Sequence, residues 1–171
     1  MTAAADPSAL VPGLGSHTFG AFNTTRTELR APCERVWALL FDRAAWMPGF
    51  AGKHVVDGLQ NTVGERAHFT SRTAGGGAHT RLEEILHLEP ARRLVLRLAT
   101  VETDATTAFV DWRLQPTQAG CLLELNLLWL DLPQPGMAWP AVRELRAAYM
   151  ASTQAVIEAH LVRLGEALAS A

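Results

Sequence analysis

The sequence lacks an excess of positive charge. It holds 15 basic and 17 acidic residues in a chain of 171, and its isoelectric point is near 6.3. Proteins that bind nucleic acids need a basic face to neutralise phosphates, so we exclude nucleic acid as a partner. Lysine is rarer still, because Lys53 is the only one in the chain. We attribute the use of arginine to the codon bias of a GC-rich genome.

Cysteine is scarce, and no metal-binding pattern is present. Cys33 and Cys121 belong to no CxxC motif or Cys/His cluster, so neither a disulfide framework nor a zinc site is predicted. We expect two buried free thiols in a reducing cytosol. Among the histidines, His79 and His87 lie on one predicted strand about 26 Å apart, which is too far to share an ion. We predict no metal and no cofactor.

Long apolar runs are absent as well. No run approaches the roughly 18 residues of a transmembrane helix, and the N-terminus lacks the positive charge and apolar core of a signal peptide. We expect a soluble, cytoplasmic protein without an integral membrane segment. Residues 1–17, rich in Ala, Pro and Gly, are expected to form a flexible tail, and residues 18–171 a single domain.

The longest regular pattern runs from Trp139 to Ala169, after the break at residues 133–136. Its one proline, Pro140, lies in the first turn, where a helix tolerates proline. At a helical spacing of 100° per residue, one face of this helix mixes polar and apolar side chains. Polar groups left unpaired against a dry sheet cost about 1–3 kcal/mol each, so the mixed face indicates the wall of a cavity. This face holds Val142, Leu145, Tyr149, Ser152, Thr153, Val156 and His160.

Upstream of this helix, short Thr-rich and apolar segments alternate with turn signals such as Gly75-Gly76-Gly77 and Glu89-Pro90. Because every separator is short, neighbouring strands are expected to pair antiparallel. One short helix is predicted from Pro32 to Asp42 and another from Arg43 to Met47. The expected strands cover residues 19–30, 53–57, 63–73, 79–88, 94–101, 107–115 and 121–130.

Local motifs in this order resemble a known family. They are residues 27–40, Trp46, Gly49, Val63-Gly64, Leu88-Glu89-Pro90 and Arg93-Leu94. Over about residues 20–169 the chain resembles the START-like (SRPBCC) superfamily, in particular its polyketide cyclase/dehydrase-type members. These share the helix-grip fold of the Bet v 1-like plant allergens.

The resemblance implies an α+β helix-grip domain. It consists of a curved seven-stranded antiparallel sheet, two short helices after the first strand, and a long C-terminal helix across the concave face. A pocket lies between the sheet and the helix in this superfamily. No catalytic residue is implied, because its enzymes share no catalytic signature that this sequence matches.

Strand parity indicates which side chains face this pocket. One parity is mostly apolar, whereas the other is mostly polar and is expected to face solvent, with Arg81 and Glu83 among its members. Together with Trp46 and one side of the long helix, the inward parity predicts a set of ligand-binding residues. They are Trp46, Phe69, Ser71, Glu84, Trp112, Trp129, Tyr149, Thr153 and Val156.

The polar residues singled out on the strands and the long helix have a second interpretation. Glu84 shares its parity with leucines, and a carboxylate there is costly unless it is paired. A β-bulge before Pro90 would instead place Glu84 outside. Tyr149 and His160 also fit an ordinary core in which neighbours satisfy their polar atoms, and Thr153 fits a bond to its own helix backbone.

Two classes of function follow for the pocket. The first is a binder or carrier of a hydrophobic small molecule or lipid. The second is a cyclase or aromatase that holds a polyketide-like substrate and transfers a proton through a Tyr, His or Glu. Few titratable groups are predicted to face the pocket, which favours binding over catalysis. A third class, an interaction module resembling the activators of a chaperone ATPase, lacks a distinctive surface in the sequence.

The last predicted strand is apolar on both faces. Leu122, Leu128 and Leu130 lie on its outer parity, and burying each Leu stabilises by roughly 1.5–3 kcal/mol. We therefore predict a homodimer through this face or a sheet edge near it. The alternative is that the short helices or the N-terminal tail cover the patch.

Overall fold

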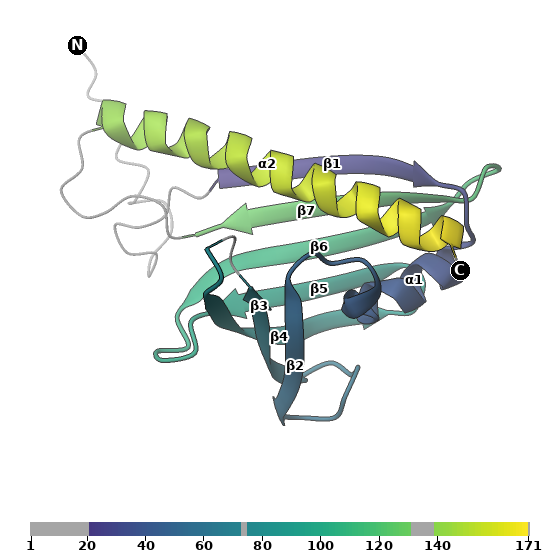
Figure 1. Cartoon of the computed structure of the whole chain (residues 1–171), viewed down its shortest axis with the longest axis horizontal. Helices are drawn as coiled ribbons and strands as arrows, with labels where there is room; N and C mark the ends of the chain where they lie inside the picture. Colours follow the sequence, from purple (N-terminus) through teal and green to yellow (C-terminus); the bar gives the residue numbers. More distant parts are fainter. Residues whose placement is uncertain (1–20, 73–74, 131–138, 171) are drawn as a thin grey trace, which may run out of the picture.

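The computed structural model describes residues 21–72, 75–130 and 139–170 (Figure 1). The predicted tail, residues 1–17, lies outside these ranges. The helices are α1 (Cys33–Phe41), the 3-10 helix η2 (Arg43–Ala45) and α2 (Trp139–Ser170). The strands are β1 (Ala21–Leu29), β2 (Phe50–Asp57), β3 (Arg66–Arg72), β4 (Ala78–Glu89), β5 (Arg93–Ala99), β6 (Thr106–Pro116) and β7 (Cys121–Trp129).

All seven strands form one antiparallel sheet in the order β1-β7-β6-β5-β4-β3-β2. From β2 to β7 each strand pairs with the next one in the sequence, as the short connections predict, and β1 pairs with β7. The sheet curves so strongly that β2 and β3 cross the direction of β1 and β7, while α2 runs along the concave side (Figure 1). The predicted helix-grip fold is confirmed.

A disulfide bond joins the start of α1 to the start of β7. Its partners, Cys33 and Cys121, are 88 positions apart in the sequence, and their Cα atoms are 5.1 Å apart, a distance that a disulfide spans without distortion. The prediction of two free thiols was therefore wrong. Spacing along the chain carries no information about two residues that only the fold brings together.

The C-terminal half of α2 packs tightly on the core, whereas the N-terminal half does not. The buried side chains are spaced four, three and four residues apart on one helical face, and they are Ile157, Leu161, Leu164 and Leu168. In the N-terminal half, Leu145 and Tyr149 remain 37% and 38% exposed. The buried stripe is thus displaced from the predicted one.

Polar contacts attach the middle of α2 to the edge strand β1. The buried Asn23 donates a hydrogen bond from Nδ2 to the carbonyl oxygen of Met150 at 3.1 Å. Gln154 and Thr25 form hydrogen bonds of 3.0 and 3.2 Å. Gln154 therefore faces β1. The helix is held at the sheet edge, and this leaves space beneath it.

A register shift in β4 decides which acidic side chains face inward. The shift falls between Ile85 and His87, where β4 has one residue more than β5. Before it, odd-numbered residues face the concave side, so Glu83 is buried and Glu84 lies outside. Of the two positions considered for Glu84, the outer one is correct and the pocket position is wrong, because the β-bulge is present. The solvent positions predicted for Arg81 and Glu83 were wrong for the same reason, since a bulge inverts the parity of a strand.

Candidate functional site

A cavity of about 350 Å³ lies between α2 and the sheet. Strands β5, β6 and β7 supply its floor, which consists of Leu98, Val110, Trp112, Leu125, Leu127 and Trp129. Helix α2 supplies its roof, which consists of Tyr149, Ser152, Thr153, Val156, Ile157 and His160. Met47 and Arg81 complete the lining. The mixed face of α2 therefore borders a cavity, as its sequence indicated.

The cavity is long and mostly apolar. At about 1.5 Å per residue, Tyr149 and His160 are roughly 16 Å apart along the helix axis. The hydroxyl groups of the lining all come from the roof, on Tyr149, Ser152 and Thr153. The floor consists of aliphatic and tryptophan side chains, so it offers a mainly apolar surface. Its indole groups are the exception, and Nε1 of Trp129 is buried without a hydrogen-bond partner among the described residues.

A second, more polar hollow of about 400 Å³ adjoins the cavity. The two share Arg81, Leu98 and Trp129 as lining residues. The polar members of its lining are His79, Thr80, Arg81, Thr100, Glu102 and Thr107. Arg81 therefore stands where the apolar cavity and the polar hollow adjoin.

An aromatic cluster supports the cavity wall at His160. The ring of Trp46 packs edge-on against Trp112 at 6.3 Å and against His160 at 6.0 Å. Its indole Nε1 donates a hydrogen bond to the carbonyl oxygen of Leu39 at 2.6 Å. Trp46 is thus held in one orientation and supports the wall formed by Trp112 and His160.

His160 is uncharged at neutral pH. Burial is the main cause that lowers the pKa of its imidazole, and the positive charge of Arg81 lowers the pKa further. Because an unperturbed histidine titrates near pH 6.5, the lowered pKa leaves a neutral ring in the cavity wall. A neutral imidazole can accept a proton as well as donate a hydrogen bond.

A buried carboxylate joins the two arginines next to the cavity. Arg43 donates from Nη1 to both oxygens of Glu83 at 2.9 and 2.7 Å, and Arg81 donates two hydrogen bonds to Oε1 at 3.0 and 2.8 Å. Burial alone would raise the pKa of Glu83, but the two positive charges and their hydrogen bonds outweigh it and lower the pKa below its ordinary value. Glu83 is therefore an anion in the folded protein.

The same two arginines contact an aromatic ring. Their guanidinium carbons lie 4.7 Å (Arg43) and 4.5 Å (Arg81) from the ring centroid of Phe69, which is within the range of a cation–π interaction. These contacts fix the guanidinium groups on β3 and β4. We name Arg43, Arg81, Glu83 and Phe69 the arginine cluster.

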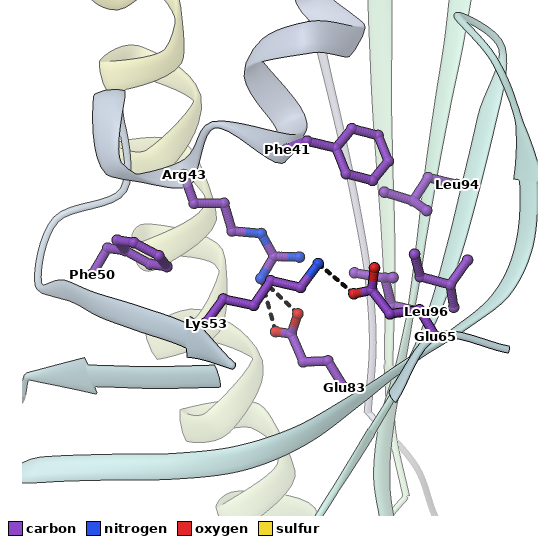
Figure 2. Close-up of a pocket in the computed structure, with 9 residues that line it drawn as sticks. Phe41, Arg43, Phe50, Lys53, Glu65, Glu83, Leu94 and Leu96 are labelled. Atoms are coloured by element: carbon purple, nitrogen blue, oxygen red, sulfur yellow. Dashed lines mark hydrogen bonds and ion pairs between the residues drawn. The ribbon is translucent and has the colours of Figure 1, made fainter. Parts of the chain in front are cut away.

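A small hollow beside the arginine cluster is too narrow for a ligand with a carbon skeleton. Its volume is about 40 Å³, enough for one or two waters. Figure 2 shows Arg43 directed at Glu83 and Lys53 directed at Glu65, with Leu94 and other apolar side chains nearby. One ion pair joins η2 to β4, and the other joins β2 to the residue before β3. Because these charges pair with one another, we interpret this hollow as a structural feature.

The structure separates the predicted ligand-binding residues. Those that line the cavity are Trp112, Trp129, Tyr149, Thr153 and Val156. Their contact with a ligand stays a prediction.

The other predicted members lie elsewhere. Trp46 packs behind the cavity wall, Phe69 is buried in the arginine cluster, and Ser71 is half-buried on β3 opposite His79. Glu84 lies on the outer face, where Arg97 binds it at 2.8 Å. Arg81 was not predicted in the lining, because the outward parity was assigned to it without the bulge that turns it inward.

In the ranges that the structure describes, no group of three His, Cys, Asp or Glu side chains is arranged to hold a metal ion. No helix within those ranges is long and apolar enough to cross a membrane.

Solved structures share this fold at low sequence identity. A protein of unknown function from Staphylococcus aureus superposes with a TM-score of 0.76 at 6% identity, over 88% of this chain and 94% of that chain. The di-domain ARO/CYC StfQ from the steffimycin biosynthetic pathway gives 0.70 at 16% identity, over 88% and 52%. Ara h 8.0201 gives 0.62 at 11% identity, over 88% and 99%. At such identities the likeness shows the fold alone.

Sequence comparison identifies the family. No curated relative matches the chain. A family described as polyketide cyclase/dehydrase and lipid transport matches residues 22–167, which span the sheet and nearly all of α2. The chain therefore belongs to the polyketide cyclase/dehydrase and lipid transport family, within the START-like (SRPBCC) superfamily.

Proposed function

We propose that the protein binds a hydrophobic small molecule or lipid in the cavity between the sheet and α2. The observation that carries this proposal is the lining: a volume of about 350 Å³ bordered mainly by aliphatic and tryptophan side chains, with hydroxyl groups on one side. Small-molecule sites have this composition and a volume of about 300–1,000 Å³. The family description, which includes lipid transport, supports the proposal.

A titration with the neutral dye Nile red tests the proposal. We expect saturable binding of one dye per chain, with a blue-shifted emission from the apolar cavity. Native mass spectrometry of the purified protein gives an independent check, because a retained lipid adds a defined mass. A signal that rises linearly with dye and never saturates would contradict a defined cavity site.

Cyclase or aromatase activity is the second candidate function, and His160 is the observation that favours it. Its neutral imidazole faces the cavity, close enough to Arg81 for that charge to lower its pKa. The imidazole would accept a proton from a carbon between two carbonyls, while the guanidinium would stabilise the oxyanion that forms. StfQ, an ARO/CYC protein with the same fold, makes this chemistry reasonable for the fold.

A poly-β-ketone thioester analogue tests the second function. If the protein is a cyclase, ring closure is faster than in buffer, and His160→Gln removes most of the acceleration. A rate equal to that in buffer would leave only the binding function.

We infer a homodimer through the outer face of the sheet. Phe22, Leu128 and Phe109 are register partners across β1, β7 and β6, and Phe22 is 50% exposed. They border a shallow hollow that also contains Arg113 and Glu124. Because this patch carries both charge signs beside its apolar centre, two copies related by a two-fold axis can pair opposite charges.

The cytoplasm stays the predicted location. The disulfide Cys33–Cys121 favours an oxidising compartment instead, since such bonds are rare where thiols are kept reduced. Fractionation of the native host, with a thiol count on the protein recovered, separates these two locations.

A further inference from the structure

The cavity contains one charged side chain and no acidic one to balance it. Among the described residues that line it, Arg81 alone carries a formal charge at neutral pH, because His160 is neutral and no Asp or Glu is present. The nearest balancing charge is Glu83, in the arginine cluster.

Glu83 cannot neutralise Arg81 fully, because Arg43 shares it. The cluster holds two guanidinium groups and one carboxylate, so one positive charge is left over. The lowered pKa of Glu83 shows that the carboxylate keeps its charge in the folded state. Arg81 therefore keeps excess positive charge where the apolar cavity meets the polar hollow, and an anionic group bound there would balance it.

Arg81 also has unused hydrogen-bonding capacity. Its Nε and Nη2 atoms both donate to Glu83 Oε1, whereas its Nη1 atom has no partner among the residues that the structure describes. Phe69 and Glu83 hold the guanidinium in place, and the side chain is 25% exposed. A preorganised donor of this kind binds a carboxylate at little entropic cost.

We propose that the ligand is an anionic amphiphile, in which one carboxylate binds to Arg81 and an apolar body lies along the floor of the cavity beneath α2. The inference rests on the proposed binding function and adds the chemical class of the ligand. It also assigns a specificity-determining role to Arg81, because an anionic head group balances the excess positive charge of this side chain.

Competition against Nile red tests the proposal in the intact protein at neutral pH and physiological salt. The two competitors are dodecanoic acid and dodecan-1-ol, which have the same chain and differ in head-group charge. We expect the acid to bind about tenfold to a hundredfold more tightly than the alcohol, the range for a charge-assisted hydrogen bond. Equal affinities in the wild-type protein would overturn the inference and leave the proposed function intact. Failure of Nile red to saturate would refute the function itself.

Variants assign the preference to a residue. Arg81→Gln should reduce the ratio of the two affinities to near one, while Arg81→Lys, which keeps the charge, should retain part of it. Using the ratio cancels any change in dye affinity, and Glu83 stays paired with Arg43 in both variants. Arg92→Gln, an arginine between β4 and β5 whose side chain is 74% exposed, is the matched control and should leave the ratio unchanged. A full preference in Arg81→Gln, or a loss in Arg92→Gln, would overturn the role of Arg81.

A measurement without any variant gives a second test. Carboxyl-labelled dodecanoic acid bound to the wild-type protein is titrated by ¹³C NMR. A neighbouring guanidinium lowers the pKa of a carboxyl group, whereas apolar burial alone raises it. We expect the bound acid to titrate below the free acid. Titration at or above the free value would place the head group away from Arg81 and overturn the inference.

Discussion

Arg43, in the short helix η2, binds both carboxylate oxygens of Glu83 on β4, at 2.9 and 2.7 Å. This pair connects the segment after α1 to the concave face of the sheet, and only 5% of the Glu83 side chain is exposed.

Glu83→Gln should destabilise the protein strongly. Loss of the carboxylate leaves two guanidinium groups without their anion, and removal of one partner of a buried ion pair costs about 3–5 kcal/mol. Urea denaturation measures the loss. Glu84→Gln is the matched control, because Glu84 is the next residue in the sequence and pairs with Arg97 on the outer face. This substitution should cost less than about 1 kcal/mol. Equal losses in the two variants would contradict the buried position of Glu83.

Stability should fall in acid partly because Glu83 becomes protonated. Its pKa in the folded protein is lowered from 4.5, because the arginines outweigh the effect of burial. The stabilisation is therefore complete above the unfolded value of 4.5 and is lost as the pH falls through the folded pKa. Between about pH 6 and pH 3, the free energy of unfolding of Glu83→Gln should decrease less than that of the wild type. Parallel curves would show that Glu83 does not contribute.

The disulfide should be detectable by alkylation. Denatured protein should take up no iodoacetamide before reduction and should label both Cys33 and Cys121 afterwards. The double change Cys33→Ala with Cys121→Ala should lower the free energy of unfolding by about 2–4 kcal/mol, since the bond restricts the unfolded chain. Full labelling without reductant would contradict the disulfide and would support the two free thiols predicted from the sequence.

Filling the cavity should weaken dye binding. Thr153→Trp adds an indole to the roof, and the extra volume excludes ligand or forces the wall to move at a cost of about 1–3 kcal/mol. Nile red affinity should therefore fall about tenfold or more. Val162→Trp is made on the same helix at a position that is 60% exposed and should bind the dye like the wild type. A similar loss in both variants would show that the dye reports on the helix surface.

If the protein is a homodimer, light scattering at micromolar concentration should give the mass of two chains. Leu128→Glu should shift this mass towards one chain, because a charge at the centre of an apolar interface is not solvated. Leu59→Glu, which is 76% exposed and far from β7 in the sheet order, is the control. A wild-type protein that is already monomeric eliminates the homodimer.

Local sequence patterns were sufficient to predict the helices and strands. Gly75-Gly76-Gly77 and Glu89-Pro90 lie at the two ends of β4, because proline and glycine restrict or release the backbone locally. Period-two segments between them formed strands, and the mixed face from Tyr149 to His160 correctly indicated a cavity. These features depend on neighbours within a few residues, so the sequence alone contains them.

Tertiary pairing decided the chemistry of the site. The register shift between Ile85 and His87 depends on how β4 meets β5, and it turns Arg81 and Glu83 into the concave face while Glu84 points out. The same holds for Cys33 and Cys121, which become neighbours only after the chain between them has folded. A bulge and a long-range contact arise from partners distant in sequence, so no local periodicity encodes them.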